Sequence, residues 1–255
     1  LSPLTHNYWS RKNGHNFTYR KYEVQKKNIG KFFNKYKKDK DFIGFNITIP
    51  YKENFISFCD KITTRANKIG SVNLIYKKNN LIYGDNTDVL GFNKTFNFLK
   101  IKNTRSVLMM GAGGAARAIL YYLNIKSIEN IDIFATSTKR KNDLSKKFKF
   151  KNFLTKSLHL KKRYDLIINA SSAGMSKDNK INRNILYLVK KASGVIDIVY
   201  NPIETDLLKE AKKHNVKSSN GLKMLVEQAK PSYERWCGNK IKIDNEIYQK
   251  LLRNI

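Results

Sequence analysis

The sequence predicts an α/β protein made of two domains, one of which is built on a doubly wound parallel sheet. Three observations predict this class. Segments typical of strands alternate with segments typical of helices along the chain. A short apolar run at residues 107–110 leads straight into a glycine-rich turn and then into a helical segment. The length of 255 residues is also sufficient for two cores, and we expect the division near residues 100–104, a polar linker.

The pattern of apolar and polar residues gives the elements in order. Strands are predicted at residues 42–47, 71–76, 81–83, 106–110, 131–134, 165–169 and 194–197. Helices are predicted at residues 3–11, 25–37, 52–63, 91–99, 115–123, 140–148 and 204–214. A further helix follows Asn220, and we expect Pro231 to interrupt it before a last helix at residues 245–252.

The composition is typical of a globular protein. Hydrophobic residues make up 41% of the chain, and no apolar run approaches the roughly 20 residues that a membrane-spanning helix needs. Cys59 and Cys237 lie far apart with no CxxC spacing, so the sequence indicates neither a disulfide framework nor a zinc site. The histidines also lack metal-ligand spacing and are expected at the surface: His6, His15, His159 and His214. We therefore expect a soluble, cytoplasmic protein without a metal.

The formal net charge is +30, and a strongly basic protein can be one that binds nucleic acid. However, the lysines are scattered through almost every segment, and the runs at residues 35–40 and 139–141 are short and separated. This pattern favours an ordinary solvated surface. A basic nucleic-acid-binding protein therefore remains only a remote alternative, which would show steeply salt-dependent affinity for DNA or RNA.

The glycine-rich turn has the pattern of a phosphate-binding turn in a dinucleotide-binding, Rossmann-type domain. It reads Gly-Ala-Gly-Gly-Ala-Ala at residues 111–116, between a buried strand and a helix. Gly111 allows the tight turn, and Gly113 lets the backbone approach a pyrophosphate. Ala116 stands where a small residue lets helix and strand pack closely. The N–H groups at the start of the helix would then face the phosphates.

The loop after the second predicted strand favours NADP over NAD. NAD-binding domains usually place a carboxylate at the end of this strand, where it holds the ribose 2′-hydroxyl. Here the strand is followed by hydroxyls and cations at residues 135–141, with no carboxylate. Such a loop suits a 2′-phosphate. The cations could also be ordinary surface charge, so NAD stays open as an alternative cofactor.

Four segments outside the turn place polar side chains at the ends of strands or the starts of helices, where they can converge on a cleft. They are residues 2–7, 46–52, 71–73 and 84–92. Together with the glycine turn and with residues 169–175, 197–202 and 220–229, their order closely resembles the shikimate dehydrogenase family. The resemblance runs over essentially the whole chain, and many independent motifs in one order are specific.

The resemblance implies both an architecture and an activity. The expected fold is an N-terminal α/β substrate-binding domain (residues 1–100 with 220–255) and a Rossmann-type NADP-binding domain (residues 101–219), with the C-terminal helices returning to the first domain. The expected reaction is the reversible, NADPH-dependent reduction of 3-dehydroshikimate to shikimate in aromatic amino-acid biosynthesis, by a monomer or homodimer. The nearest rival is a quinate/shikimate dehydrogenase with relaxed use of NAD and NADP. A catalytically inactive cofactor sensor is another rival.

The resemblance also implies residue roles. Lys52 matches the family's catalytic lysine, and Asp88 matches the aspartate that pairs with it. The substrate's carboxylate and hydroxyls would be held by Ser2, Thr48, Asn73, Asp88, Tyr200 and Gln228. The cofactor would be lined by Gly111, Ala112, Gly113, Gly114, Ala115, Ala135, Thr136, Ser137, Lys139, Arg140, Ile198, Gly221 and Met224.

Two departures from the family pattern stand out. The family's cofactor loop usually reads Asn-Arg-Thr where this chain has Ala135-Thr136-Ser137, so Arg140 or Lys139 is expected to replace the arginine. The family's first strand and the first serine of its S-x-S-P element are absent ahead of Leu1, and we expect the chain to be truncated there.

The chemistry agrees with these roles. Hydride addition to a ketone places negative charge on its oxygen, so a proton donor must stand beside it. A lysine ammonium next to a carboxylate can donate that proton. Other interpretations remain for single residues, because Asp88 can cap a helix and Asn73 and Gln228 can be structural amides.

Overall fold

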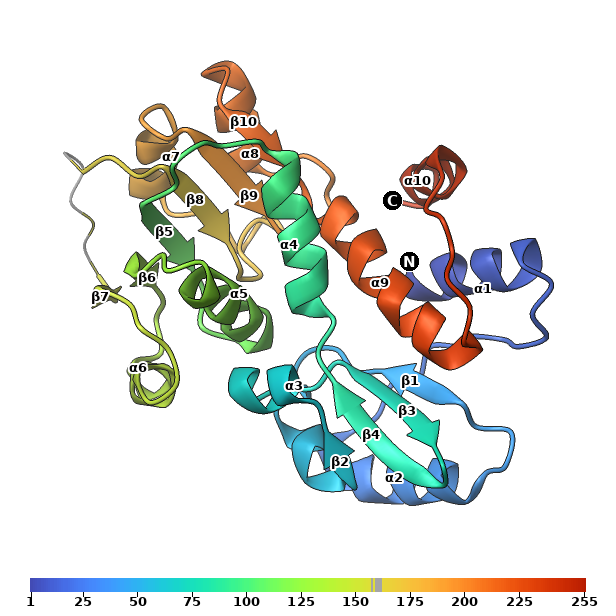
Figure 1. The fold of residues 1–255 in the computed structure, drawn as a ribbon. Coiled ribbons are helices and arrows are strands. Elements are labelled where there is room, and N and C mark those ends of the chain that lie inside the picture. The colour runs from blue at the N-terminus through green and yellow to red at the C-terminus, as the bar shows by residue number, and fades with distance from the viewer. Residues whose placement is uncertain (157, 159–161) are drawn as a thin grey trace. The chain divides into compact units, whose positions relative to one another are not determined.

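The computed structural model describes residues 1–156, 158 and 162–255. The chain divides into two compact units, and each contains its own sheet (Figure 1). The first unit comprises Leu1–Thr87 and Ala229–Asn254, and the second comprises Asp88–Gln228 and Ile255. The α/β class predicted from the sequence is confirmed, with a mixed sheet in the first unit and a parallel, Rossmann-type sheet in the second.

The first unit is built on a four-stranded sheet in the order β1-β3-β4-β2. Its strands are β1 (Gly44–Asn46), β2 (Lys61–Ile62), β3 (Leu74–Lys78) and β4 (Leu81–Asp85). β1 and β4 pair antiparallel with β3, whereas β2 pairs parallel with β4. Leu74 lies opposite Asp85. The start of β3 and the end of β4 therefore meet at one edge, which carries several of the predicted site residues.

Helices and a cluster of apolar side chains complete the first unit. α2 places Ile29 and Phe33 on its buried face, where they belong to one core cluster with Phe55, Ile75 and Ile82. The helical elements are α1 (Ser2–Lys12), η1 (Lys26–Asn28), α2 (Ile29–Lys38), η2 (Asn54–Phe58), α3 (Thr64–Ile69) and α10 (Asn245–Leu252).

The helix predicted at residues 52–63 is wrong. Only Asn54–Phe58 is helical there, as a short 3-10 segment, and β2 follows it. Asp60 explains the difference, because its N–H donates to the carbonyl of Ile82 at 2.9 Å and its carboxylate accepts from the N–H of Ile82 at 2.8 Å. Attachment to β4 therefore overrides the helical spacing of the apolar residues.

His6 is buried, contrary to the surface position expected for it. It is 0% exposed, and its ring stacks on Tyr19 with the ring centroids 4.4 Å apart. Burial lowers the pKa of His6 to about 3. His15 and His214 are at least partly exposed, and His159 lies outside the described residues.

We expect acid to weaken the fold through His6. Its folded pKa is lowered, so below about pH 6.5, the ordinary histidine pKa, the unfolded chain binds a proton that the folded chain excludes. The free energy of unfolding should then decrease by up to about 1.4 kcal/mol per pH unit from this group. His6→Phe keeps an aromatic ring stacked near Tyr19 and should remove this pH-dependent part of the free energy of unfolding. Urea unfolding across the acidic range measures it, and parallel pH curves for the two proteins would contradict the prediction.

The second unit is built on a six-stranded sheet in the order β10-β9-β8-β5-β6-β7. Its strands are β5 (Ser106–Met110), β6 (Asn130–Phe134), β7 (Asn152–Leu154), β8 (Leu166–Asn169), β9 (Gly194–Asp197) and β10 (Lys217–Ser219). The chain leaves β5 for β6 on one side and later returns to β8 on the other, so the strand order reverses at β5. The carboxyl ends of β5 and β8 therefore flank the crevice in which such sheets bind ligands.

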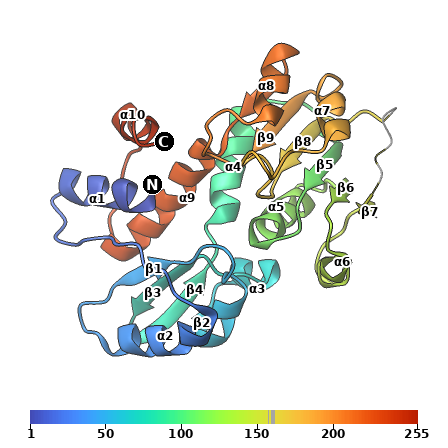
Figure 2. The ribbon, with the colours of Figure 1, turned by 180° about the vertical axis from the view of Figure 1, so that it is seen from behind.

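Helices cover both faces of this sheet, with α4 and α5 on one face and α7 and α8 on the other (Figures 1 and 2). The helices are α4 (Asp88–Phe98), α5 (Gly114–Ile125), α6 (Thr138–Ser145), α7 (Arg183–Val189) and α8 (Asp206–Lys213). A long helix, α9 (Gly221–Cys237), begins in this unit and belongs to the first unit from Ala229 on. None of the helices in the described residues has the length and apolar character needed to cross a membrane.

α9 continues through Pro231, although the sequence predicts an interruption there. Proline removes one backbone hydrogen bond from a helix and costs roughly 3 kcal/mol. On either side of it, however, Val226, Ala229 and Tyr233 are at most 1% exposed. Burial of these side chains outweighs the lost hydrogen bond, so the helix stays continuous.

Candidate active site

The turn after β5 has the geometry of a phosphate-binding turn. Gly111 has a φ of 98°, a conformation that favours glycine. A Cβ atom on Gly111 would lie 2.7 Å from the carbonyl oxygen of Ala170, so the turn packs against the loop after β8. Gly113 is the N-cap of α5, and a Cβ atom on it would meet nothing within 4 Å. The first N–H groups of α5 therefore adjoin open space, where they can bind phosphate oxygens.

Alanine substitutions at these two glycines should affect different properties, cofactor affinity at Gly113 and stability at Gly111. Gly113→Ala puts a methyl group into the open space at an ordinary φ of −87°, so NADPH affinity should fall by about 10-fold or more while stability is kept. Gly111→Ala puts a methyl group into the Ala170 backbone at a left-handed φ, and should cost about 2 kcal/mol of stability. Calorimetric titration measures the affinity for NADPH, and thermal unfolding measures the stability. Equal loss of stability in the two variants would contradict the assignment of Gly113 to phosphate binding.

The loop after β6 holds hydroxyls and cations beside this turn. Ser137 is the N-cap of α6, and it is exposed, as are Thr136 and Lys139. Arg140, in the first turn of α6, donates from Nη1 to the carbonyl oxygen of Ala112 at 3.1 Å. This hydrogen bond brings the guanidinium to the glycine turn. The structure therefore places the loop predicted to bind the 2′-phosphate next to the turn predicted to bind the pyrophosphate.

Asp132, the acidic side chain within β6, is occupied inside the unit. It is 2% exposed. Its carboxylate accepts from the hydroxyl of Tyr164 at 2.6 Å and from Nδ2 of Asn152 at 2.8 Å, and it pairs with the ammonium of Lys162. It therefore does not take the place of the carboxylate that holds a ribose 2′-hydroxyl in NAD-binding sheets.

In the first unit, buried hydrogen bonds brace the turn that leads into α4. Oδ1 of Asn73 accepts from the N–H of Thr87 at 2.7 Å and from its hydroxyl at 3.2 Å. Nδ2 of Asn86 donates to the carbonyl and the hydroxyl of Ser71, both at 3.0 Å. The four residues are at most 2% exposed. Asn73 thus has a structural contact through its oxygen, as the alternative interpretation of this residue expects.

Asp85 and Arg65 belong to this brace, and sequence reasoning missed them. Asp85 ends β4 and is 0% exposed. Its carboxylate accepts from Nε of Arg65 at 2.7 Å, from the hydroxyl of Thr63 at 2.6 Å and from the N–H of Asn86 at 2.7 Å. Nη2 of Arg65 donates to the second oxygen. This bidentate pair fixes the point where the chain leaves β4 for Asp88. The available signal was an aspartate at a strand end directly before Asn-Thr-Asp.

Lys52 and Asp88 fall in different units, and local contacts place each one. The carbonyl of Lys52 accepts from the N–H of Val72 at 2.7 Å, which attaches the lysine to the segment that enters Asn73. Asp88 is the first residue of α4, directly after the braced turn. A carboxylate at this end of a helix interacts favourably with the helix dipole.

In the second unit, the structure brings Ile198 and Gly221 into contact at the start of α9. The N–H of Gly221 donates to the carbonyl of Val199 at 3.0 Å. A Cβ atom on Gly221 would lie 2.0 Å from the carbonyl oxygen of Ile198, so only glycine permits this approach. Met224 follows one turn later on α9 and is buried.

Gln228 lies against the start of α4. A Cβ atom on Gly91 would lie 2.8 Å from the Cβ atom of Gln228. Gly91 comes one helical turn after Asp88, so α9 crosses α4 close to that carboxylate. Nε2 of Gln228 also donates to the carbonyl of Leu225 at 3.2 Å. Tyr200 is half-buried in the loop after β9.

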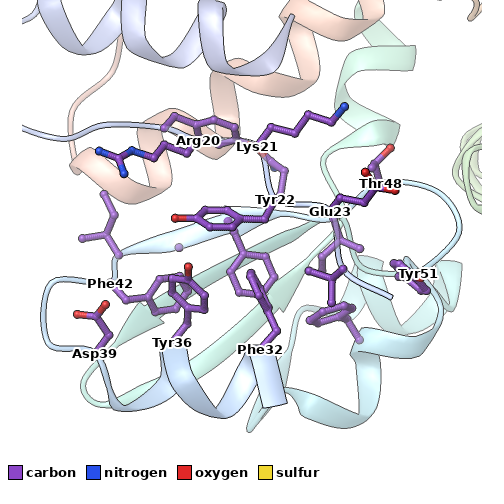
Figure 3. A pocket seen from close by; sticks show the side chains of 18 of the residues that line it. Arg20, Lys21, Tyr22, Glu23, Phe32, Tyr36, Asp39, Phe42, Thr48 and Tyr51 are labelled. Atoms are coloured by element: carbon purple, nitrogen blue, oxygen red, sulfur yellow. The ribbon is translucent and has the colours of Figure 1, made fainter. Parts of the chain in front are cut away.

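A groove of about 1150 Å³ runs along the first unit between residues 16–25 and 41–51 (Figure 3). Thr48 and Tyr51 lie at one end of it. Among the described residues that line it, Thr48 is the only one predicted to bind the substrate. Ser2, at the start of α1, does not line the groove. The wall is largely aromatic, with Tyr22, Phe32, Tyr36 and Phe42. Such a lining does not match a small polar acid, so the groove is not the predicted substrate site.

Comparison with known proteins agrees with these features. The sequence model described as "Shikimate dehydrogenase substrate binding domain" matches residues 1–75. A relative from Methanococcus maripaludis, named "Shikimate dehydrogenase (NADP(+))", is 36% identical over 94% of this chain and 88% of its own length. One of the same name from Clostridium beijerinckii is 36% identical over 98% and 92%. The crystal structure of shikimate 5-dehydrogenase from Thermus thermophilus in complex with NADP(H) and shikimate has a TM-score of 0.85 at 25% identity, over 99% of this chain and 94% of that chain. The chain belongs to the shikimate dehydrogenase family.

Proposed function

We propose that Lys52 and Asp88 are the catalytic pair of an NADP-dependent shikimate dehydrogenase. Membership of the family makes this chain an oxidoreductase that interconverts 3-dehydroshikimate and shikimate with NADP, in aromatic (chorismate) biosynthesis. The observation that carries this function is the match to curated relatives over almost the whole chain. The roles of individual residues follow from the resemblance of their motifs to the family, and contacts within each unit support some of them.

The proposed mechanism assigns proton transfer to Lys52. NADPH, when bound, supplies the hydride. The ammonium group of Lys52 stabilises the negative charge that develops on the carbonyl oxygen and donates its proton from Nζ. The carboxylate of Asp88 orients Lys52 and accepts a hydrogen bond from a substrate hydroxyl. In the oxidation of shikimate, the neutral amine of Lys52 is the base.

The substrate is held by a set of hydroxyls and amides in this proposal. Because Oδ1 of Asn73 accepts from Thr87, its Nδ2 is the proposed donor to a substrate oxygen. Gln228 is supported by its position against the first turn of α4. The full set of proposed substrate contacts is Ser2, Thr48, Asn73, Asp88, Tyr200 and Gln228.

The cofactor is held along the carboxyl edge of the six-stranded sheet in this proposal. Residues 111–115 bind the pyrophosphate through backbone N–H groups. Ser137, Lys139 and Arg140 bind the 2′-phosphate, with Arg140 replacing the family's usual arginine; its contact with Ala112 supports this role. Ile198, Gly221 and Met224 line the remaining half of the cofactor.

We assign residues 1–100 with 220–255 to the substrate-binding, catalytic domain and residues 101–219 to the dinucleotide-binding domain. The glycine turn and the 2′-phosphate loop both fall in the second of these. Lys52, Asn73 and Asp88 fall in the first. The catalytic pair and the phosphate-binding residues thus fall in different domains of this assignment.

A direct assay tests the function. Purified protein is expected to oxidise NADPH in the presence of 3-dehydroshikimate and to reduce NADP in the presence of shikimate. Quinate in place of shikimate separates the nearest rival, which would turn over both acids. Absence of turnover by well-folded protein would overturn the proposal.

A further inference from the structure

Asp197 is a buried carboxylate at the end of β9 that the proposed mechanism does not use. It is 0% exposed, and it lies in register with Asn169, the last residue of β8. Its Oδ1 atom accepts from Nδ2 of Asn169 and from the N–H of Val199, both at 2.9 Å. Its Oδ2 atom accepts from the hydroxyl of Thr205 at 2.6 Å. We call Asn169, Asp197 and Thr205 the Asp197 cluster.

A carboxylate is energetically costly in this position. Burial raises the pKa of Asp197 to about 6, although three hydrogen bonds favour the ionised form. Only a carboxylate presents two acceptor oxygens to the three donors, because asparagine has a single acceptor oxygen. The side chain is therefore matched to its donors despite the cost of burying its charge.

On one side, the Asp197 cluster holds the loop after β8. Oδ1 of Asn169 accepts from the N–H of Ser171 at 3.1 Å and from its hydroxyl at 2.7 Å. Nδ2 of Asn169 also donates to the carbonyl of Ala173 at 2.8 Å. The same loop packs against the glycine turn, since Ala170 is the residue that a Cβ atom on Gly111 would strike.

On the other side, the Asp197 cluster holds the loop after β9 and the start of α9. The N–H of Ile198 donates to the carbonyl of Asn169 at 3.0 Å, and Val199 is bound to Asp197 itself. The carbonyl of Val199 then accepts from Gly221, the first residue of α9. The arrangement of Ile198 and Gly221 therefore depends on a chain of contacts that begins at Asp197.

The order of the strands indicates which part of the cofactor lies beside the loops after β8 and β9. β6, whose loop carries the proposed 2′-phosphate residues, lies on one side of β5, and β8 and β9 lie on the other (Figure 1). A dinucleotide with its pyrophosphate on the turn after β5 places its adenosine toward β6. Its nicotinamide then extends toward the ends of β8 and β9.

We propose that Asp197 is a positioning residue that fixes the nicotinamide side of the cofactor crevice. Its carboxylate holds the loop after β8, the loop after β9 and the start of α9 in a single arrangement. The nicotinamide ring then meets the substrate carbonyl at a defined distance, on which the rate of hydride transfer depends. The inference rests on the proposed function, because it takes the loop after β6 as the adenosine side.

The decisive variant is Asp197→Asn, which keeps the shape of the side chain and removes one acceptor. We expect kcat with NADPH and 3-dehydroshikimate to fall roughly 10- to 100-fold. Affinity for 2′,5′-ADP, which has the adenosine phosphates but no nicotinamide, should stay unchanged in calorimetric titration. In a second pair, Thr205→Val should lower kcat and Thr205→Ser, which restores the hydroxyl, should recover it.

Asp165 offers a matched control at the opposite end of the same sheet. Its Oδ2 atom also accepts three hydrogen bonds, from the N–H groups of Arg105 and Ser106 at 2.9 Å and from the hydroxyl of Ser106 at 3.0 Å. Asp165→Asn should lower the thermal unfolding midpoint without lowering kcat of the folded protein. It therefore separates a loss of stability from a loss of positioning.

The outcomes are distinct. A lower kcat in Asp197→Asn, with 2′,5′-ADP affinity intact and Asp165→Asn fully active, supports the inference. Unchanged kcat in Asp197→Asn, an equal loss in Asp165→Asn, or a parallel loss of 2′,5′-ADP affinity would overturn it. If the unmodified protein binds NADPH but does not turn over substrate, that result contradicts the proposed function and not the inference. In that case the inference is tested by binding alone. Asp197→Asn must then weaken the affinity for NADPH and leave the affinity for 2′,5′-ADP unchanged, and any other result overturns the inference as well.

Discussion

Replacing Lys52 by alanine is expected to lower kcat for the shikimate reaction by about 10²- to 10⁴-fold and to leave KM nearly unchanged. The physical reason is that the ammonium group acts on the charge that develops at the carbonyl oxygen, which is absent from the bound ketone. The variant keeps the backbone hydrogen bond that the carbonyl of Lys52 accepts from the N–H of Val72. Steady-state kinetics in both directions measure the effect.

The matched control is Lys78→Ala, an exposed lysine at the end of β3. It removes the same charge from the same unit and should leave kcat and KM as they are. A large rise in KM at unchanged kcat in Lys52→Ala would instead indicate a residue that only binds substrate. An equal effect of both variants would show that the net charge of the unit matters rather than Lys52.

Arg140→Ser should reduce kcat/KM for NADPH by about 10- to 100-fold and leave kcat/KM for NADH unchanged. A charge-assisted hydrogen bond from a guanidinium to the 2′-phosphate contributes only when that phosphate is present. NADH has no such phosphate, so it reports any general damage to the turn, with which Arg140 also makes contact through Ala112. The comparison of the two cofactors in the unmodified protein and the variant is the measurement.

Lys139→Ser is the companion to this experiment, because Lys139 directly precedes Arg140 in the exposed first turn of α6. If Lys139 binds the phosphate instead, its variant will show the larger loss and Arg140→Ser will show little. Equal use of NADPH and NADH by the unmodified protein would refute the 2′-phosphate role of the whole loop.

The parts of the fold that the sequence predicted well are those set by local chemistry. β5, β9 and α10 have the predicted bounds, because each is a short apolar or amphipathic run with clear ends. The prediction of a helix at residues 52–63 was wrong because hydrogen bonds to β4, more than twenty residues away in the chain, decide the conformation of this segment. β7 and β10, three residues each, lie at the edges of their sheet and were missed because so short a run has no recognisable period.

The same distinction applies to the candidate site. The glycine turn is a local pattern, and its backbone geometry follows the sequence closely. The contacts of Arg65 with Asp85 and of Asn169 with Asp197 join residues that only the sheet brings together. Burial of His6 likewise depends on Tyr19, which lies outside the helix of His6. Such partners follow from topology rather than from spacing, so sequence alone could not name them.

The glycines of the second unit are of two kinds, those with no space for a side chain and those beside open space. A library that samples every amino acid at Gly91 and Gly221 should return almost only glycine when it is selected for folded protein, because a side chain there would overlap α9 or the Ile198 backbone. The same selection should accept many residues at Gly113, where space is open. A selection for growth without aromatic amino acids should then restore glycine at that position. The difference between the two selections separates the requirements of packing from those of catalysis, one residue at a time.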